Sequence, residues 1–204
     1  DTDYLDILYC HRPDPETPLS EVVWAMSDIV ASGKALYWGT SEWDADTIRQ
    51  ACAFAADQRL RPPIVEQPEF NLTWKRPLRE ECAPLRAETG LGLITWSPLA
   101  SGMLSGKYVD AVPRDSRASL PSMDWLLPRL TDTRAVDPLR TLVSLAGDLG
   151  TTAATLSIAW CLRDPAVDSV LLGARTTDQL LENAGALEVA ARLGTDELSL
   201  LDGL

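Results

Sequence analysis

The stretch YLDILYCHRPDP (residues 4–15) decides how the rest of the chain is interpreted. Its apolar run, Tyr4–Cys10, ends at His11, the only histidine of the chain, and a proline-bounded turn follows. A run of this length, rich in leucine, isoleucine and tyrosine, is too short for a helix and is typical of a β-strand. The sequence therefore predicts a strand whose carboxyl end carries a histidine.

Four more short apolar runs follow: Ala35–Trp38, Pro63–Val65, Leu91–Trp96 and Val170–Leu172. Longer helical patterns separate them, and such alternation predicts an α/β fold with a parallel sheet that is covered on both faces. A (β/α)8 TIM barrel would need eight strands, whereas five are found. A Rossmann fold has little support because no G-x-G-x-x-G follows the first strand. Without a linker or composition break, residues 1–204 are expected to be one domain or part of one.

The predicted helices begin and end at recognisable signals. In the first, Thr17 is the expected N-cap, Pro18 takes the first helical position and Gly33 stands at the end. The third helix, near Leu78–Thr89, is interrupted or delayed by Pro84 and closes at Gly90. The other predicted helices are a striped one through Ile48, Ala51, Cys52 and Ala55, one over 139–149, Ala153–Arg163, about Thr177–Arg192, and a short one near Glu197. A long irregular segment, Ser97 to about Pro138, precedes the last four.

Composition excludes several classes of function. The chain carries 18 Lys and Arg against 30 Asp and Glu, a net charge of −12, so nucleic acid is not an expected partner. No apolar run approaches the ~20 residues of a membrane span, so no membrane insertion is expected. The four widely spaced cysteines favour reduced thiols over disulfides or a zinc site, and hence a cytoplasmic protein without a metal.

Polar or unusual residues follow every predicted strand. They are His11, Gly39–Glu42, Glu66 with Gln67, Trp96 with Ser97, and Gly173–Arg175. In βα barrels the chemistry lies at the carboxyl ends of the strands, so these residues would surround one site. Each also has a simpler interpretation: Ser41 and Gln67 as backbone caps, Trp96 as core packing, and Arg175 in a surface salt bridge rather than beside a bound anion.

The loop Ser97–Tyr108 (SPLASGMLSGKY) is the most informative segment. Its glycines and serines before Lys107 would let backbone N–H groups approach an anion closely, and the ammonium would add charge. Ser116–Ser119 offers a second cation, Arg117. A flexible surface loop is the alternative, although long loops in compact domains are usually functional or disordered.

Seven motifs give the chain a clear family resemblance. They are HRPDPETP (11–18), GKALYWGTSEW (33–43), EQPEFN (66–71), TWSPLASGMLSGKY (95–108), SRAS (116–119), IAWCLR (158–163) and SVLLGARTTDQLLEN (169–183). The chain resembles the C-terminal part of an aldo-keto reductase, in the branch that includes the voltage-gated potassium channel beta subunits and bacterial reductases. The resemblance implies a (β/α)8 barrel of which this chain supplies about the last five βα units, so that residues 1–204 form a single domain that is incomplete at its N-terminus.

The resemblance also implies NADPH as the cofactor and gives each matching residue a role. His11 would orient the substrate carbonyl, while the family's aspartate, tyrosine and lysine match no segment of this chain. Ser41 and Gln67 would hold the nicotinamide carboxamide, and Trp96 would stack on its ring. The remaining matches are Ser97, Leu99, Ser101 and Lys107 at the pyrophosphate, Arg117 near the adenosine, and Gly173, Arg175, Gln179, Glu182 and Asn183 at the 2′-phosphate and adenine. Glu42 departs from the family's usual arginine or asparagine and receives no role.

Three functions follow as hypotheses. The first is reduction of an aldehyde or ketone by NADPH, with a small carbonyl compound as the substrate. The second is a cofactor-binding regulatory subunit like the channel beta subunits. His11 argues against this hypothesis, because the channel subunits usually carry asparagine at the matching position. The third is an inactive truncated fragment, because a partial barrel leaves unpaired strand edges. The oligomeric state stays open, a homo-oligomer included.

Overall fold

The computed structural model describes residues 2–114, 116–120, 126, 128 and 133–204. Five strands form one sheet in chain order: β1 (Leu5–Cys10), β2 (Ala35–Thr40), β3 (Val65–Glu66), β4 (Gly92–Thr95) and β5 (Ser169–Val170). The pairs β1–β2, β2–β3 and β3–β4 are parallel. The predicted α/β class with five strands is confirmed, and the bounds of each strand shift by only a few residues.

Contacts divide the chain into two compact units. The first contains Asp1–Glu69, Arg76–Trp96 and Ala166–Ser169. The second contains Phe70–Lys75, Ser97–Pro165 and Val170–Leu204. Strands β1 to β4 lie in the first unit, and the long loop after β4 and the C-terminal helices lie in the second.

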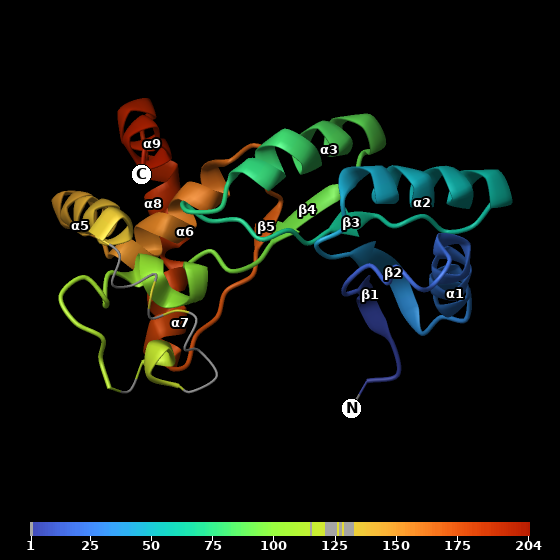
Figure 1. Ribbon diagram of the computed structural model, residues 1–204, viewed down its shortest axis with the longest axis horizontal. Helices are drawn as coiled ribbons and strands as arrows, with labels where there is room; N and C mark the ends of the chain where they lie inside the picture. The colour runs from blue at the N-terminus through green and yellow to red at the C-terminus, as the bar shows by residue number, and fades with distance from the viewer. Residues whose placement is uncertain (1, 115, 121–125, 127, 129–132) are drawn as a thin grey trace. The chain divides into compact units, whose positions relative to one another are not determined.

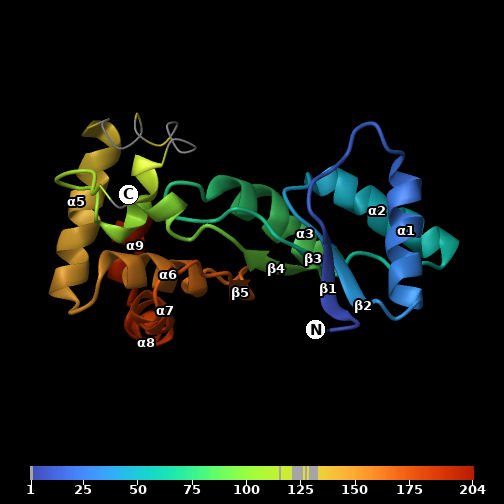
Figure 2. The ribbon, with the colours of Figure 1, turned by 90° about the horizontal axis from the view of Figure 1, so that it is seen from below.

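Three helices accompany the strands of the first unit: α1 (Leu19–Ala31), α2 (Ala45–Gln58) and α3 (Ala83–Thr89). Val23 and Met26 of α1 pack with Trp38 of β2 and with Ala51 and Ala55 of α2 in one buried cluster. Helices α1 and α2 therefore cover the same face of the sheet, as Figures 1 and 2 show. Apolar residues recur at helical spacing on both helices, which explains why these faces are buried.

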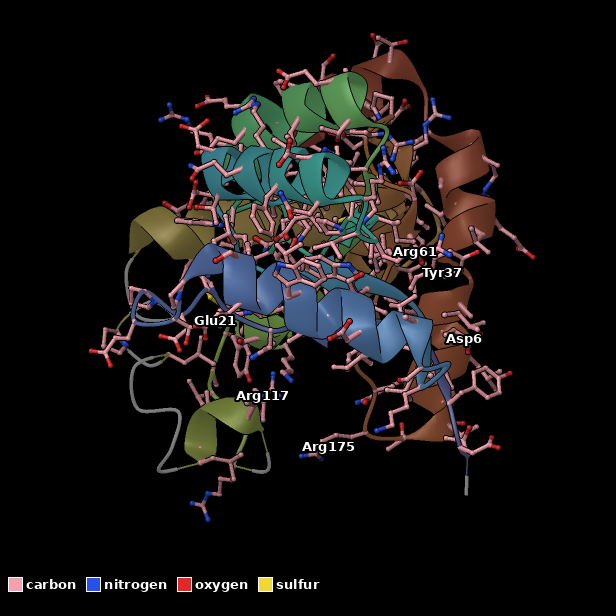
Figure 3. The ribbon with its side chains drawn as sticks, turned by 90° about the vertical axis from the view of Figure 1, so that its right-hand side faces the viewer. Asp6, Glu21, Tyr37, Arg61, Arg117 and Arg175 are labelled. Carbon is pink, nitrogen blue, oxygen red and sulfur yellow. The ribbon has the colours of Figure 1, made fainter. Side chains whose placement is uncertain are left out.

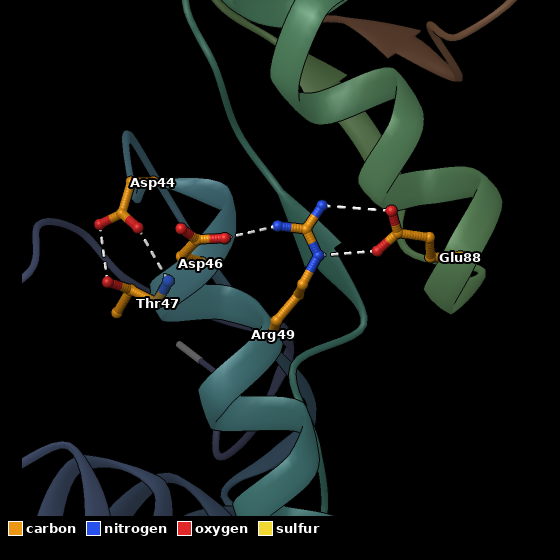
Figure 4. Close-up of polar contacts among 5 residues, drawn as sticks. All are labelled: Asp44, Asp46, Thr47, Arg49 and Glu88. Carbon is orange, nitrogen blue, oxygen red and sulfur yellow. Dashed lines mark hydrogen bonds and ion pairs between the residues drawn. The ribbon is translucent and has the colours of Figure 1, made fainter.

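An ion-pair cluster joins α2 to α3 (Figure 4). Asp44 caps α2 by accepting the Thr47 amide at 2.8 Å, as a side-chain oxygen at this position commonly does. Arg49 pairs with Asp46 at 2.7 Å on its own helix and with Glu88 of α3 at 2.7 Å. These side chains are largely exposed, so the pairs orient the two helices more than they stabilise the fold.

Two details of the predicted helices differ in this unit. Thr17 as the N-cap of α1 is wrong: Pro18 holds that position without a side-chain cap, and the Thr17 hydroxyl donates instead to Asp14 at 2.7 Å. The third helix is confirmed with Gly90 as its left-handed end, but it starts with a π-helical turn, η1 (Leu78–Cys82). Helix α3 then begins one residue before Pro84, where a missing N–H costs little.

The second unit is mainly helical. Its helices are α5 (Thr133–Asp148), α6 (Ala153–Arg163), α7 (Thr177–Ala184), α8 (Ala186–Arg192) and α9 (Thr195–Asp202), with short 3₁₀ turns η2 (Ala100–Ser105) and η3 (Arg117–Ser119). Helix α6 contacts α5, α7 and α8, and its residues 153–161 are buried. Its Trp160 stacks on Phe70 at 4.9 Å between ring centroids. Helix α6 is thus the core helix of this unit, and it matches its predicted bounds.

The loop and the last helices refine the prediction. The irregular segment is broken by η2 and η3, and its residues 115, 121–125, 127 and 129–132 lie outside the described part. Helix α5 runs through Pro138, which stands inside it, rather than starting after it. The predicted helix 177–192 is two helices that meet at Gly185.

Within the described residues, no single helix is long and apolar enough to cross a membrane. The pair Val136–Asp148 and Ala153–Arg163 passes the length and composition test only when both helices are counted together, and they meet at a bend of 91°. All four cysteines are free thiols, with Cys82 and Cys161 buried.

Candidate functional site

The ends of β1 and β2 are joined by an arginine. His11 directly follows β1 and is exposed. The next residue, Arg12, donates through Nη1 to the His11 carbonyl at 2.6 Å and to the Ser41 hydroxyl at 3.0 Å. His11 and Ser41, which are 30 positions apart by the difference of their numbers, therefore belong to one polar cluster.

Ser41 and Gln67 are in direct contact at the ends of β2 and β3. The Ser41 hydroxyl donates to the backbone carbonyl of Gln67 at 2.9 Å, and the backbone N–H of Gln67 donates to the Thr40 carbonyl at 2.9 Å. Parallel pairing of Thr40 with Glu66 sets this register. The structure thus brings together the two residues that the sequence predicted as one binding pair.

Trp96 is held at its indole edge by Glu42. The indole N–H donates to Glu42 Oε1 at 2.8 Å, and the same oxygen accepts the Glu69 amide at 2.5 Å. The Arg12 guanidinium lies 6.0 Å from the centre of the Trp96 ring. Glu42 has a left-handed backbone, with φ 57°. Its departure from the family pattern was visible in the sequence, but its partner was not.

A buried carboxyl lies next to these residues. Glu66 is fully buried, and its Oε2 accepts the Thr40 hydroxyl at 2.5 Å. Burial raises the pKa of Glu66 to about 7, and hydrogen bonds from Thr40 and from the Glu42 and Trp43 amides oppose the rise. Sequence reasoning placed Glu66 at the end of a strand but gave it no role, because nothing local marks it as buried.

The loop after β4 lies in the second unit and has an unusual backbone. Ser97, Ala100 and Ser101 adopt positive φ values of 58°, 45° and 59°, as do Gly102 and Gly106. Such conformations are uncommon outside glycine and cluster at functional sites. The carbonyl of Leu99 accepts the amides of residues 102 and 104 at 2.8 Å and 3.2 Å, which closes the turn.

Lys107 folds back over this loop. Its ammonium lies 4.9 Å from the centre of the Tyr108 ring, and a Cβ at Gly102 would stand 3.1 Å from Lys107 Nζ. The predicted combination of a tight glycine turn and a cation is therefore present. Some backbone amides of the loop already donate within the loop, so an anion would have to be bound by the remaining amides.

Two exposed arginines of the same unit come from different segments. Arg117 belongs to η3, and Arg175 precedes α7. In the view of Figure 3 the Arg175 side chain extends toward the side on which η3 carries Arg117. The amide of Arg175 donates to Gln179 Oε1 at 2.8 Å, so Gln179 shapes the turn that presents Arg175. Gly173 is exposed in the same segment.

Glu182 and Asn183 face the body of the second unit. Glu182 Oε1 accepts the hydroxyl of Thr152, the N-cap of α6, at 2.6 Å, and Asn183 is buried. Both therefore have structural contacts besides the adenosine role that the resemblance implies. Of the predicted site residues, His11, Ser41, Gln67 and Trp96 lie in the first unit and the others in the second.

The chain matches one family model and is similar to two plant proteins. The model of the Aldo/keto reductase family matches residues 1–204. A protein of Oryza sativa subsp. japonica named "Probable voltage-gated potassium channel subunit beta" is 43% identical over 205 residues, which cover 100% of this chain and 62% of that protein. An Arabidopsis thaliana protein of the same name is 46% identical over 190 residues, covering 93% of this chain and 58% of that protein. The chain thus spans about three fifths of the length of these relatives.

Proposed function

The chain belongs to the aldo/keto reductase family, and from this we propose that the protein binds NADPH and reduces aldehydes or ketones to alcohols. When bound, NADPH would supply the hydride. We also infer that β1 to β5 are the last five strands of a (β/α)8 barrel. The chain order of the five strands in the sheet and the parallel pairing of β1 to β4 support this inference.

The nicotinamide end would be held by the first unit. The Ser41 hydroxyl oxygen has two lone pairs, and Arg12 uses one of them, so an amide N–H of the cofactor can take the second. Gln67 would supply the matching amide side chain. Trp96, with its edge fixed by Glu42, would offer an aromatic face for stacking. These residue types fit a neutral, flat carboxamide ring.

The phosphates would be held by the second unit. The left-handed loop with Lys107 suits a pyrophosphate, which needs close backbone approach and positive charge. Arg175, beside the start of α7, suits the 2′-phosphate because the helix N-terminus adds favourable partial charge. Arg117 would add a cation near the adenosine.

His11 would donate a hydrogen bond that orients the substrate carbonyl. The proton donor, which the resemblance implies to be a tyrosine supported by a lysine and an aspartate, is assigned to no residue of this chain. The observation that carries the proposal is the contact between Ser41 and Gln67, because it joins two predicted carboxamide contacts in the same unit as His11 and Trp96.

The decisive experiment is a titration with NADPH of the purified full-length protein, because the tyrosine, lysine and aspartate that turnover requires match no segment of residues 1–204. Quenching of tryptophan fluorescence would report binding at Trp96, and loss of NADPH absorbance with a panel of aldehydes would report turnover. We expect saturable quenching and turnover, both weakened in Ser41→Ala. Absence of quenching at millimolar NADPH would contradict cofactor binding, and binding without turnover on any aldehyde would contradict the reductase.

A second candidate is a cofactor-binding regulatory subunit, which the names of the two plant relatives favour. It predicts that NADPH binds without appreciable turnover and that the protein co-purifies with a membrane channel. His11 distinguishes the two candidates, since His11→Asn should abolish turnover in a reductase and leave a purely regulatory activity unchanged.

A further inference from the structure

Glu66 lies on the face of the sheet opposite the candidate site. It pairs in register with Thr40, and Ser41 and Gln67 directly follow the two strands, which end at Thr40 and Glu66. Successive side chains in a strand point to opposite faces. Trp38, two residues before Thr40, packs against α1 and α2, so Thr40 and Glu66 belong to the helix-covered face.

The Glu66 carboxyl contacts the turn at the end of β2 from the helix-covered face of the sheet. Its Oε2 accepts the Thr40 hydroxyl at 2.5 Å, and the amides of Glu42 and Trp43 favour its charged form. Its other oxygen, Oε1, makes no hydrogen bond in the part of the chain that the structure describes. A buried carboxyl with one unmatched oxygen is costly, so its presence calls for an explanation.

The same turn presents two residues of the candidate site. Ser41 is fixed by its bond to the Gln67 carbonyl, and Glu42, at φ 57°, accepts the Trp96 indole N–H. We propose that Glu66 is a positioning residue for the nicotinamide end of the cofactor site, acting through the turn Thr40–Trp43. This inference rests on the proposed function, because it assigns Glu66 a part in cofactor binding.

The positioning depends on pH. The titratable groups near Glu66 are Glu42 in the turn, Tyr9 of β1 and Cys82 of η1. Burial raises the pKa of Tyr9 above its usual value and that of Cys82 to about 12, so both are neutral near pH 7. The negative charge of Glu42 adds to the burial that raises the pKa of Glu66 to about 7. Near neutral pH, therefore, Glu66 changes from an acceptor of several hydrogen bonds to a carboxylic acid that donates one.

The test is the dissociation constant of NADPH between about pH 6 and about pH 8. In the wild-type protein we expect about fivefold weaker binding at the acidic end, with a midpoint near pH 7, as for a partly lost hydrogen bond. Glu66→Gln, an uncharged isostere, should bind weakly and lack this step. Glu81→Gln, which removes an exposed carboxylate of η1, is the matched control and should keep the step.

Thr40→Val is a second test that does not alter Glu66 itself. It removes the hydroxyl that lowers the pKa of Glu66, so the midpoint should move to higher pH. A pH step that Glu66→Gln retains would belong to the nucleotide's own phosphate or to another group, and would overturn the proposal.

Amide hydrogen exchange separates this inference from the proposed function. Without nucleotide, exchange at Glu42 and Trp43, corrected for its intrinsic pH dependence, should rise below pH 7 in the wild type and not in Glu66→Gln. If this step is present but no nucleotide binds, the proposed function fails while the control of the turn by Glu66 stands. If nucleotide binds and neither measurement distinguishes Glu66→Gln from the wild type, the inference fails.

Discussion

The carboxylate of Glu42 accepts the indole N–H of Trp96 at 2.8 Å. The two residues are 54 positions apart, and their bond fixes one edge of the aromatic ring that we expect to stack on the cofactor. Glu42, which received no role from the family resemblance, therefore has a specific contact. Its carboxylate accepts two N–H groups, from the Trp96 indole and the Glu69 backbone.

The first prediction separates the acceptor of Glu42 from its charge. Glu42→Gln keeps an oxygen that can accept the indole N–H, so NADPH affinity should change by less than about twofold. Glu42→Ala frees the Trp96 edge and should weaken NADPH binding by about fivefold. Fluorescence titration of both variants measures the difference. Equal losses in the two would show that charge, and not the bond to Trp96, matters.

The second prediction concerns stability and the ionisation of Glu66. The folded-state pKa, about 7, lies above the ordinary value of 4.5. The folded chain thus holds the proton more tightly, and this contribution to stability is complete below 4.5 and is lost as pH rises toward 7. Glu66→Gln, which does not ionise, should therefore gain up to about 3 kcal/mol relative to wild type at about pH 8 and much less at about pH 5.

Urea denaturation at both pH values measures that change in the free energy of unfolding. A difference between wild type and Glu66→Gln that is the same at both would contradict the raised pKa. Glu81→Gln again serves as the control, since its exposed carboxylate should leave the pH dependence unaltered.

The third prediction tests the close approach of β2 and β3. A Cβ at Gly39 would stand 2.5 Å from Val65 Cγ1 and 2.6 Å from the Val65 carbonyl, and backbone cannot move aside as a side chain can. Gly39→Ala should destabilise the fold by about 1–3 kcal/mol. Gly147→Ala, in α5 with no atom within 4 Å of the new Cβ, should be neutral or stabilising by up to about 1 kcal/mol. Thermal melts compare the two, and equal effects would show that strand spacing is adaptable.

The fourth prediction concerns the 2′-phosphate. Arg175→Met keeps most of the side-chain length but removes the guanidinium, so NADPH binding should weaken by about tenfold or more. NADH lacks the 2′-phosphate, and its affinity should stay unchanged. Arg192→Met, at the exposed end of α8, is the control and should alter neither affinity. An equal loss of affinity for NADPH and NADH would show that Arg175 does not bind the 2′-phosphate.

Much of the fold could be predicted because its signals are local. Short apolar runs marked all five strands, and Gly90 marked the end of α3. Two predictions were wrong for local reasons. Asp14 accepts the Thr17 hydroxyl that was expected to cap α1. The apolar pattern of residues 177–192 continues through Gly185, but the helix is divided there. Here a hydrogen bond or a change of direction outweighed helical periodicity.

The candidate site was predictable only as a set of residue types. Ser41 and Gln67 were expected to bind the same group, and the structure shows them in contact because the strands they follow lie side by side. Arg12 could not be assigned, since its bond to Ser41 depends on how β1 and β2 are aligned. The burial of Glu66 was equally hidden, because its neighbours in the chain are the ordinary polar and apolar residues of a strand end.

The sequence by itself determined the alternation of strands and helices, the family, and the polar residues that follow the strands, since each depends on neighbours along the chain. Only the tertiary structure decided that Glu42 bonds to Trp96 and that Glu66 lies behind the turn that carries Ser41. Glu66 and Thr40 are 26 positions apart, and residues so distant meet only when strand pairing sets the register and helix packing removes water.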